Sequence, residues 1–252
     1  MFRLHALVGS TASDQVGYKV KALTNGNYVV SSRYWDCQAA LGCSGTITDV
    51  GAVTWGSGTS GVSGVVSASN SLVGSTANDQ VGRLATALTN GNYVVFSYMW
   101  DCQPALGCAG TVADVGAVTW ASGTTGISGV VTASNSLVGS TASDQLGSDG
   151  VTALSNGNYV VGSTNWTCQA ALGCAGGTVT SVGAVTWGSG STGVSGAVTT
   201  SNSLVGSTVS DVVGVVTALT NGNFTVGASV WGATDEGLAI AVSGASGAAG
   251  SL

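Results

Sequence analysis

The chain contains four copies of one sequence unit, and this internal repeat limits the possible folds more than any other feature. The run Leu-Val-Gly-Ser-Thr begins at Leu7, Leu72, Leu137 and Leu204. A unit that recurs at a fixed period folds into one supersecondary element that buries its apolar surface against its neighbours. We therefore predict a single repeat domain over residues 1–252, with repeat phases near 7–71, 72–136, 137–203 and 204–243. Residues 244–252, rich in Gly, Ala and Ser, are expected to form a flexible tail.

Each copy is predicted to form four short strands. In the third copy these strands cover residues 151–154, 159–163, 183–187 and roughly 197–205. The first two are separated by Asn156-Gly157-Asn158, a strong hairpin signal because Asn and Gly tolerate positive φ. The sequence contains one Glu and two Lys, and no apolar stripe with a helical period extends beyond one turn. The sequence therefore predicts an all-β fold.

Two architectures can bury the faces of such repeats. In a β-propeller each unit is one four-stranded blade, whereas in a β-solenoid or open β array the units follow one another along a line. Residues 1–17 contain only a fourth strand, and residues 215–243 contain only the first three. Pairing of residues 4–8 with residues 238–242 would close a ring. We therefore expect a small propeller closed by terminal strand exchange, with the solenoid or open array as the alternative.

The six cysteines form three identical pairs with five residues between the members of each pair. The fourth copy lacks both cysteines, which is expected if the partners lie within one repeat. We predict disulfides that close short loops, each contributing about 2 kcal/mol to stability. Free buried thiols and a metal site are weaker alternatives, since no His accompanies any pair. The pairs are Cys37–Cys43, Cys102–Cys108 and Cys168–Cys174.

Seven tryptophans occur at two positions of the repeat. Trp55, Trp120 and Trp187 end an alternating strand, so we expect them to pack between neighbouring units. The other four stand where the second strand leaves for the cysteine loop. They are expected to cover the base of that loop, and alternatively to form a ring of aromatic platforms for sugar rings. These possible ligand contacts are Trp35, Trp100, Trp166 and Trp231.

One Asp recurs in each copy, in the pattern Ser-Thr-x-x-Asp. Its carboxylate is expected to accept hydrogen bonds from nearby backbone N–H groups and so to cap a turn. Calcium binding is the alternative, although calcium sites usually contain a denser acidic cluster. The residues are Asp14, Asp79, Asp144 and Asp211.

The composition argues against catalysis and against several classes of partner. His5 is the only His and Glu236 the only Glu, so no catalytic triad or carboxylate pair can recur through the repeats. The formal net charge is −6, which disfavours nucleic acid and anionic lipid as partners. No apolar run approaches the length of a membrane span. We predict a protein that is not an enzyme and has no cofactor.

The repeat sequence resembles that of long bacterial surface proteins of the filamentous-haemagglutinin type. The resemblance covers Val-Thr-Ala-Leu-Thr-Asn-Gly-Asn, Gly-Ala-Val-Thr-Trp-Gly-Ser-Gly and Ser-Asn-Ser-Leu-Val-Gly-Ser-Thr. It implies an extracellular or cell-surface location and a structural or adhesive role. The cysteine insert departs from that pattern. The first residues lack the apolar run of a secretory signal, so we expect this chain to be a piece of a longer exported protein.

Three functions are compatible with these features. The first is a structural or adhesive module of a bacterial surface or secreted protein, with glycans or a neighbouring cell surface as partners. The second is a lectin-like module that uses the ring of Trp residues beside the loops. The third is a self-assembling extracellular fibre subunit, because unpaired strand edges can pair between chains.

Overall fold

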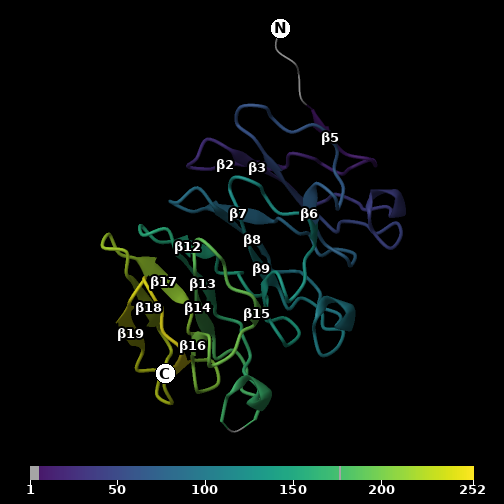
Figure 1. Ribbon diagram of the computed structural model, residues 1–252. Coiled ribbons are helices and arrows are strands. Elements are labelled where there is room, and N and C mark those ends of the chain that lie inside the picture. Colours follow the sequence, from purple (N-terminus) through teal and green to yellow (C-terminus); the bar gives the residue numbers. More distant parts are fainter. Residues whose placement is uncertain (1–5, 176) are drawn as a thin grey trace.

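The computed structural model describes residues 6–175 and 177–252 and consists of β-strands joined by turns and short 3₁₀ helices. The chain forms a stack of sheets that runs from the purple N-terminal region at one end to the yellow C-terminal region at the other (Figure 1). The all-β prediction is confirmed. His5, Leu4 and the rest of residues 1–5 lie outside the described part of the chain.

Three sheets have the same five-stranded order, in which four antiparallel strands of one repeat are joined by a parallel strand from the next repeat. The first contains β2 (Lys19–Ala22), β3 (Tyr28–Ser32), β4 (Ala52–Gly56), β6 (Ser71–Val73) and β10 (Gly129–Val130). The second contains β7 (Leu84–Ala87), β8 (Tyr93–Ser97), β9 (Ala117–Ala121), β11 (Leu137–Val138) and β15 (Gly196–Ala197). The third contains β12 (Val151–Ala153), β13 (Tyr159–Ser163), β14 (Ala184–Gly188), β16 (Ser203–Val205) and β20 (Gly250–Ser251).

Both ends of the stack carry incomplete sheets. At the N-terminal end β1 (Leu7–Val8) pairs in parallel with β5 (Gly64–Val65). At the C-terminal end β17 (Val215–Ala218), β18 (Phe224–Ala228) and β19 (Leu238–Val242) form a three-stranded sheet. We call these the head sheet and the tail sheet.

The expected ring closure is wrong. β1 pairs with β5, and β19 pairs with β18 alone among the described strands. Each fourth strand instead accepts a parallel strand from the following repeat, which places successive units one after another along a line. This cross-repeat pairing makes the fold an open β array, and the two ends of the chain lie at opposite ends of the stack (Figure 1).

Two further expectations need correction. The predicted strand over residues 197–205 is split into β15 and β16, because Asn202 accepts a hydrogen bond from the N–H of Thr199 at 2.9 Å and turns the chain. Residues 244–252 do not form a free tail. They include β20, and the N–H of Leu252 donates to the carbonyl of Val205 at 2.9 Å.

The core lies between successive sheets. Because each internal sheet is covered on both faces, adjacent residues such as Val29 and Val30 are both buried. One core cluster joins Val29 and Val53 of the first sheet to Tyr93 of the second, and equivalent clusters fill the next two spaces. Burial on both faces accounts for the apolar run Tyr-Val-Val in the second strand of the first three repeats.

Candidate functional site

The hairpin turns and the tryptophans that end the third strands form a joint between neighbouring repeats. In the first repeat the side-chain amides of Asn25 and Asn27 and the indole N–H of Trp55 all donate to the carbonyl of Gly123 in the second repeat, at 2.8, 2.8 and 2.9 Å. The side-chain oxygen Oδ1 of Asn27 accepts the N–H of Gly58 at 3.0 Å. One carbonyl therefore receives three donors from the preceding unit.

The same joint recurs at the next two junctions. The carbonyl of Gly190 accepts from Asn90, Asn92 and Trp120. The carbonyl of Gly244 accepts from Asn156, Asn158 and Trp187. Glycine is required at the acceptor position, because a Cβ on Gly190 would collide with the carbonyl of Gly157. Each indole combines packing with a hydrogen bond, which refines the prediction that these residues pack between units.

The two ends of the stack carry the unmatched halves of this joint. Gly58, the first acceptor glycine, is exposed and accepts none of the hydrogen bonds found in the described residues. In the tail sheet the turn residues Asn221 and Asn223 remain, and Ala241 stands where the other repeats have Trp. Neither side-chain amide of that turn donates to an acceptor in the described part of the chain.

The recurring Asp is a buried cap that connects two turns. In the second repeat one carboxylate oxygen of Asp79 accepts the N–H groups of Ser75 and Thr76, both at 2.8 Å, and the other accepts the N–H of Asp101 at 3.0 Å. The cap prediction is confirmed. The other three Asp residues make the corresponding contacts, which begin at Ser10, Ser140 and Ser207. The described residues contain no cluster of three or more His, Cys, Asp or Glu that could hold a metal ion.

Burial sets the ionisation of these carboxyl groups. It raises the pKa of Asp79 to about 7 and that of Asp144 to about 6, although backbone hydrogen bonds act in the opposite direction. At the more open head end burial also raises the pKa of Asp14, but hydrogen bonds from Thr11, Asp36 and Ser10 outweigh it and hold this pKa below its usual value. Chemically similar caps therefore titrate differently along the stack.

The cysteines form the three predicted disulfides. Their Cα atoms lie 5.9, 5.9 and 6.0 Å apart, within the usual range for a disulfide. Each disulfide closes a loop that contains a one-turn 3₁₀ helix, and the three helices project from the same side of the stack (Figure 1). These helices are η1 (Ala39–Leu41), η2 (Pro104–Leu106) and η3 (Ala170–Leu172).

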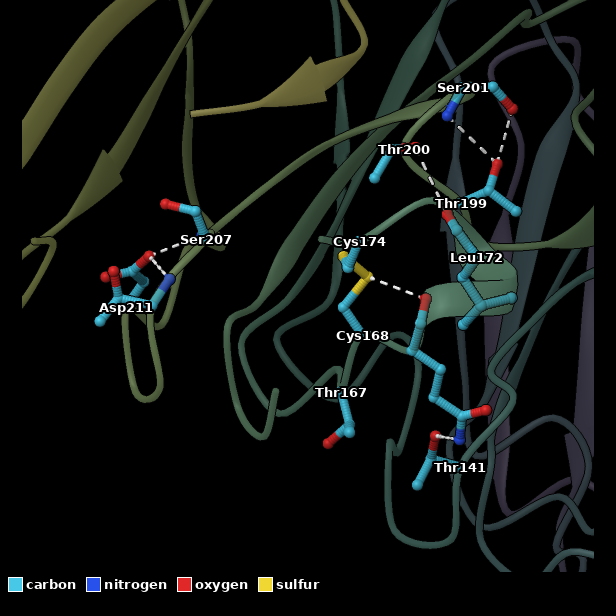
Figure 2. Close-up of a disulfide and its surroundings, with 12 residues drawn as sticks. Thr141, Thr167, Cys168, Leu172, Cys174, Thr199, Thr200, Ser201, Ser207 and Asp211 are labelled. Atoms are coloured by element: carbon cyan, nitrogen blue, oxygen red, sulfur yellow. Dashed lines mark hydrogen bonds between the residues drawn. A yellow bond between two sulfur atoms is a disulfide. The ribbon is translucent and has the colours of Figure 1, made fainter. Parts of the chain in front are cut away.

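Each loop is tied to the rest of its repeat and, from the second repeat onward, to the turn before it. Figure 2 shows the third loop, where the carbonyl of Leu172 accepts the N–H of Thr200 at 3.0 Å. The side chain of Gln169 donates to the hydroxyl of Thr141 at 3.0 Å. A cleft of about 240 Å³ lies between the second and third loops, and it is lined mainly by Ala, Val, Gly and the Cys102–Cys108 disulfide.

The tryptophans beside the loops are core residues. Trp35, Trp100 and Trp166 have no exposed surface, and Trp231 is half-buried. A sugar ring needs an accessible indole face, so the structure contradicts the platform hypothesis for these three residues. They cover the base of the cysteine loops, which was the other expectation.

Sequence analysis missed a partly exposed aromatic and basic cluster near the head end, in which Tyr18 is exposed and Arg33 and Tyr34 are half-buried. The guanidinium of Arg33 lies 4.2 Å from the ring centroid of Tyr18 and 4.5 Å from that of Tyr34, and it donates to both hydroxyl groups. In the next repeat Arg83 lies 4.6 Å from the centroid of Tyr98, with the two residue types exchanged between strands. The cluster could have been anticipated from where the Lys and Arg residues stand in the sequence. The formal net charge of −6 does not reveal that they are concentrated near one end.

Charge is unevenly distributed along the stack. All five Lys and Arg residues lie within the first 83 residues, whereas seven of the eleven Asp and Glu residues follow them. Lys19 and Lys21 are exposed on β2, and Asp235 and Glu236 are exposed beside β19. None of the helices within the described ranges is long and apolar enough to cross a bilayer.

These features define an all-β repeat protein whose units are joined by a recurrent hydrogen-bonded contact. A family model described as "Repeat of unknown function (DUF5650)" matches residues 22–83, 87–148 and 153–215. The chain belongs to this family. The family model matches three copies; the fourth copy has no cysteine pair, and its sheet has three strands in the described part of the chain. A search of curated proteins found no match.

Proposed function

We propose that this chain is a non-enzymatic structural or adhesive module of a bacterial cell-surface or secreted protein. Its role is to hold a fixed length and direction between the parts of a larger assembly. The observation that carries this proposal is the joint, in which three donors meet one carbonyl at each of three junctions. A joint that repeats with the same geometry makes the stack a stiff rod, because bending at one junction would break several hydrogen bonds together.

The extracellular location is supported by the disulfides. Three closed loops without a free cysteine fit an oxidising compartment. The wording shared with filamentous-haemagglutinin-type repeats favours a bacterial surface, and the low charge and the Gly, Ser and Thr content suit an extended secreted array.

No observation at the four Trp residues beside the loops favours the lectin-like alternative. Trp35, Trp100 and Trp166 are fully buried, so binding through their faces would require the loops to open. The proposed adhesive role therefore assigns glycan binding to a surface other than these indole faces.

The rod proposal can be tested by removing one period. Deletion of residues 72–136 joins Ser71 to Leu137 and leaves the repeat pattern continuous. Small-angle scattering should show a folded particle whose longest dimension is shorter by about 10 Å, the usual distance between stacked sheets. A deletion that leaves the longest dimension unchanged, or a full-length chain with a spherical profile, would refute the rod.

The proposed location has a separate test. When the chain is directed to the bacterial periplasm, it should be recovered with all three disulfides formed and with no thiol that reacts with an alkylating agent. Recovery of the folded protein with free thiols would count against an extracellular role and would leave the rod proposal untouched.

A further inference from the structure

The guanidinium of Arg33 has no acidic partner in the described part of the chain. Its hydrogen bonds go to the hydroxyl groups of Tyr18 and Tyr34, at 2.8 and 2.6 Å, and the rings of both residues pack against it. The Nε–H group of Arg33 is buried and has no acceptor among the described residues. Arg33 is therefore a half-buried cation that neutral groups hold in position. Such a cation is costly unless an anion pairs with it.

Arg83 of the second repeat has the same character. It donates to the side-chain oxygen of Gln80 at 2.9 Å and to the sulfur of Met99 at 3.1 Å, and it packs against the ring of Tyr98. These partners are also neutral, and Arg83 is half-buried as well. Two consecutive repeats therefore each hold a guanidinium against a Tyr ring without pairing it to a carboxylate of the described residues.

The strands bring these two Arg residues to one internal junction, between the first and second repeats. β7 packs against β2 and β3 of the first repeat. Arg83 directly precedes β7, and Arg33 directly follows β3. The start of β2 pairs with the end of β3, and β7 is the counterpart of β2 in the second repeat. Both Arg residues therefore stand at the same end of the strands, in adjacent sheets.

The junction between the third and fourth repeats shows that these positions surround one space. A cavity of about 240 Å³ lies there, and its lining includes one residue from each of the three equivalent positions, namely Asp149, Thr164 and Gly214. By their place in the repeat, the counterparts at the first junction are Tyr18, Arg33 and Arg83. One aromatic ring and two guanidinium groups therefore share this place in the first junction. Like charges placed together are unfavourable, and an anion between them removes the repulsion.

The carboxylates of the neighbouring segments make other contacts. Asp149, one repeat further along the same side of the stack, accepts the N–H and the hydroxyl of Thr164 at 2.6 and 2.8 Å. In the first repeat Asp14 accepts the N–H of its own turn, and Asp36 accepts the N–H of Asp49 at 2.8 Å. Within the described ranges none of these groups pairs with a guanidinium, so the positive charge of the first junction is available to an external anion.

From these observations we propose that the junction between the first and second repeats binds a polysaccharide that carries carboxylate groups, such as a uronic acid polymer. The planar guanidinium groups of Arg33 and Arg83 match the two oxygens of a carboxylate. The Tyr rings beside them combine an apolar face with a hydroxyl group, which suits the mixed surface of a sugar ring. Arg33, Arg83 and Tyr98 each keep part of their surface exposed. The inference rests on the adhesive part of the proposed function, for which it names the ligand class and the binding surface.

The ligand class is tested by measuring the binding of the full chain to oligomers of polygalacturonate and of alginate. At least one should bind, and the affinity should fall as salt screens the charges. The methyl ester of that ligand keeps the sugar without the charge, and poly-glutamate keeps the charge without the sugar. Each should bind about tenfold more weakly, the usual effect of losing one group of a charged contact. Binding to neither uronate, or equal binding to poly-glutamate or to the ester, would overturn the proposal.

The site is tested with two substitutions and a matched control. Arg33→Gln and Arg83→Gln should each weaken uronate binding about tenfold. Lys21→Gln removes the same charge from an exposed position of β2 and should change the affinity by less than about twofold. An equal loss from Lys21→Gln would show that binding follows overall charge and would overturn the site.

The experiment also separates binding from folding. Thermal unfolding shows whether each variant is folded, and if a Gln variant is not, Arg83→Lys replaces it. This variant keeps the charge but loses the planar fork, so it should still weaken binding, and unchanged affinity would overturn the role of Arg83. The scattering test of the rod does not depend on any of these results, so failure of this inference is distinguishable from failure of the proposed function.

Discussion

The amide of Asn90 donates to the carbonyl of Gly190, 100 residues further along the chain, at a distance of 2.8 Å. The same side chain accepts the N–H of Asn92 through its oxygen at 3.1 Å. One asparagine therefore closes its own hairpin turn and fastens that turn to the next repeat. The turn sequence Asn-Gly-Asn serves both purposes at each internal junction.

The contribution of this joint can be isolated by comparing two asparagines. Asn90→Ala removes the local bond and the bond to Gly190, whereas Asn221→Ala removes only the local bond to Asn223. We expect Asn90→Ala to lower the free energy of unfolding by about 1 kcal/mol more than Asn221→Ala, the usual value of one buried hydrogen bond. Chemical denaturation measures both. Equal effects would show that the joint adds nothing to stability.

The buried hydroxyl pair in each complete sheet should behave as a coupled unit. The hydroxyl oxygens of Thr119 and Ser136 lie 2.7 Å apart in the second sheet, and both residues are fully buried. Thr119→Val or Ser136→Ala alone leaves one hydroxyl with a missing partner and should cost about 1–3 kcal/mol, whereas the double variant should cost less than the sum. A double-mutant cycle by denaturation checks this. Additive effects would contradict direct coupling.

Removal of the disulfides should weaken the fold without abolishing it. The tail sheet forms without a cysteine loop, so strand formation does not depend on the disulfide. Replacement of Cys102 and Cys108 by Ser should lower stability by about 2 kcal/mol through the entropy of the short loop. Thermal unfolding measures the loss. The intact mass of the unsubstituted chain, with its three disulfides, should lie about 6 Da below that of the fully reduced chain. Loss of all structure on reduction would contradict this expectation.

Stability should rise as the solution is acidified from about pH 8 to about pH 5. Burial raises the pKa of Asp79 to about 7 and that of Asp144 to about 6, above the ordinary value of 3.8. In that window the folded state binds more protons than the unfolded state, so the free energy of unfolding falls as pH increases.

Thermal unfolding across the pH range measures this slope, and Asp79→Asn should flatten it while lowering stability overall. Below about pH 4 the sign reverses for Asp14, whose lowered pKa makes its ionised form stabilising. If the unfolding temperature falls steadily from pH 8 to pH 5, the backbone hydrogen bonds outweigh burial at Asp79 as well.

Much of the fold could be read from the sequence. The repeat period predicted the extent of the structural units, and Asn156-Gly157-Asn158 predicted a hairpin turn. The absence of cysteines from the fourth copy predicted that the disulfides form within each repeat. These features are local, because a turn depends on the φ values its residues tolerate and a short loop depends on nearby thiols. The turn-capping role of the four Asp residues was predictable for the same reason, since two of the donors to Asp79 lie three and four residues earlier. Its third donor, the N–H of Asp101, lies in a later turn.

Only the tertiary structure decided how the units follow one another. The complementary phases of residues 1–17 and 215–243 suit a closed ring and an open stack equally well, because both place a fourth strand beside a third. The outcome depends on contacts across a whole repeat, such as the bond from Trp55 to Gly123 and the parallel pairing of β6 with β10. The same limit applied to Trp35, whose burial arises from packing around its loop, and to the segregation of charge to opposite ends. The sequence by itself determined what each repeat is, since that rests on short-range stereochemistry, whereas the direction of the array rests on contacts between residues far apart in the chain, which no local pattern encodes.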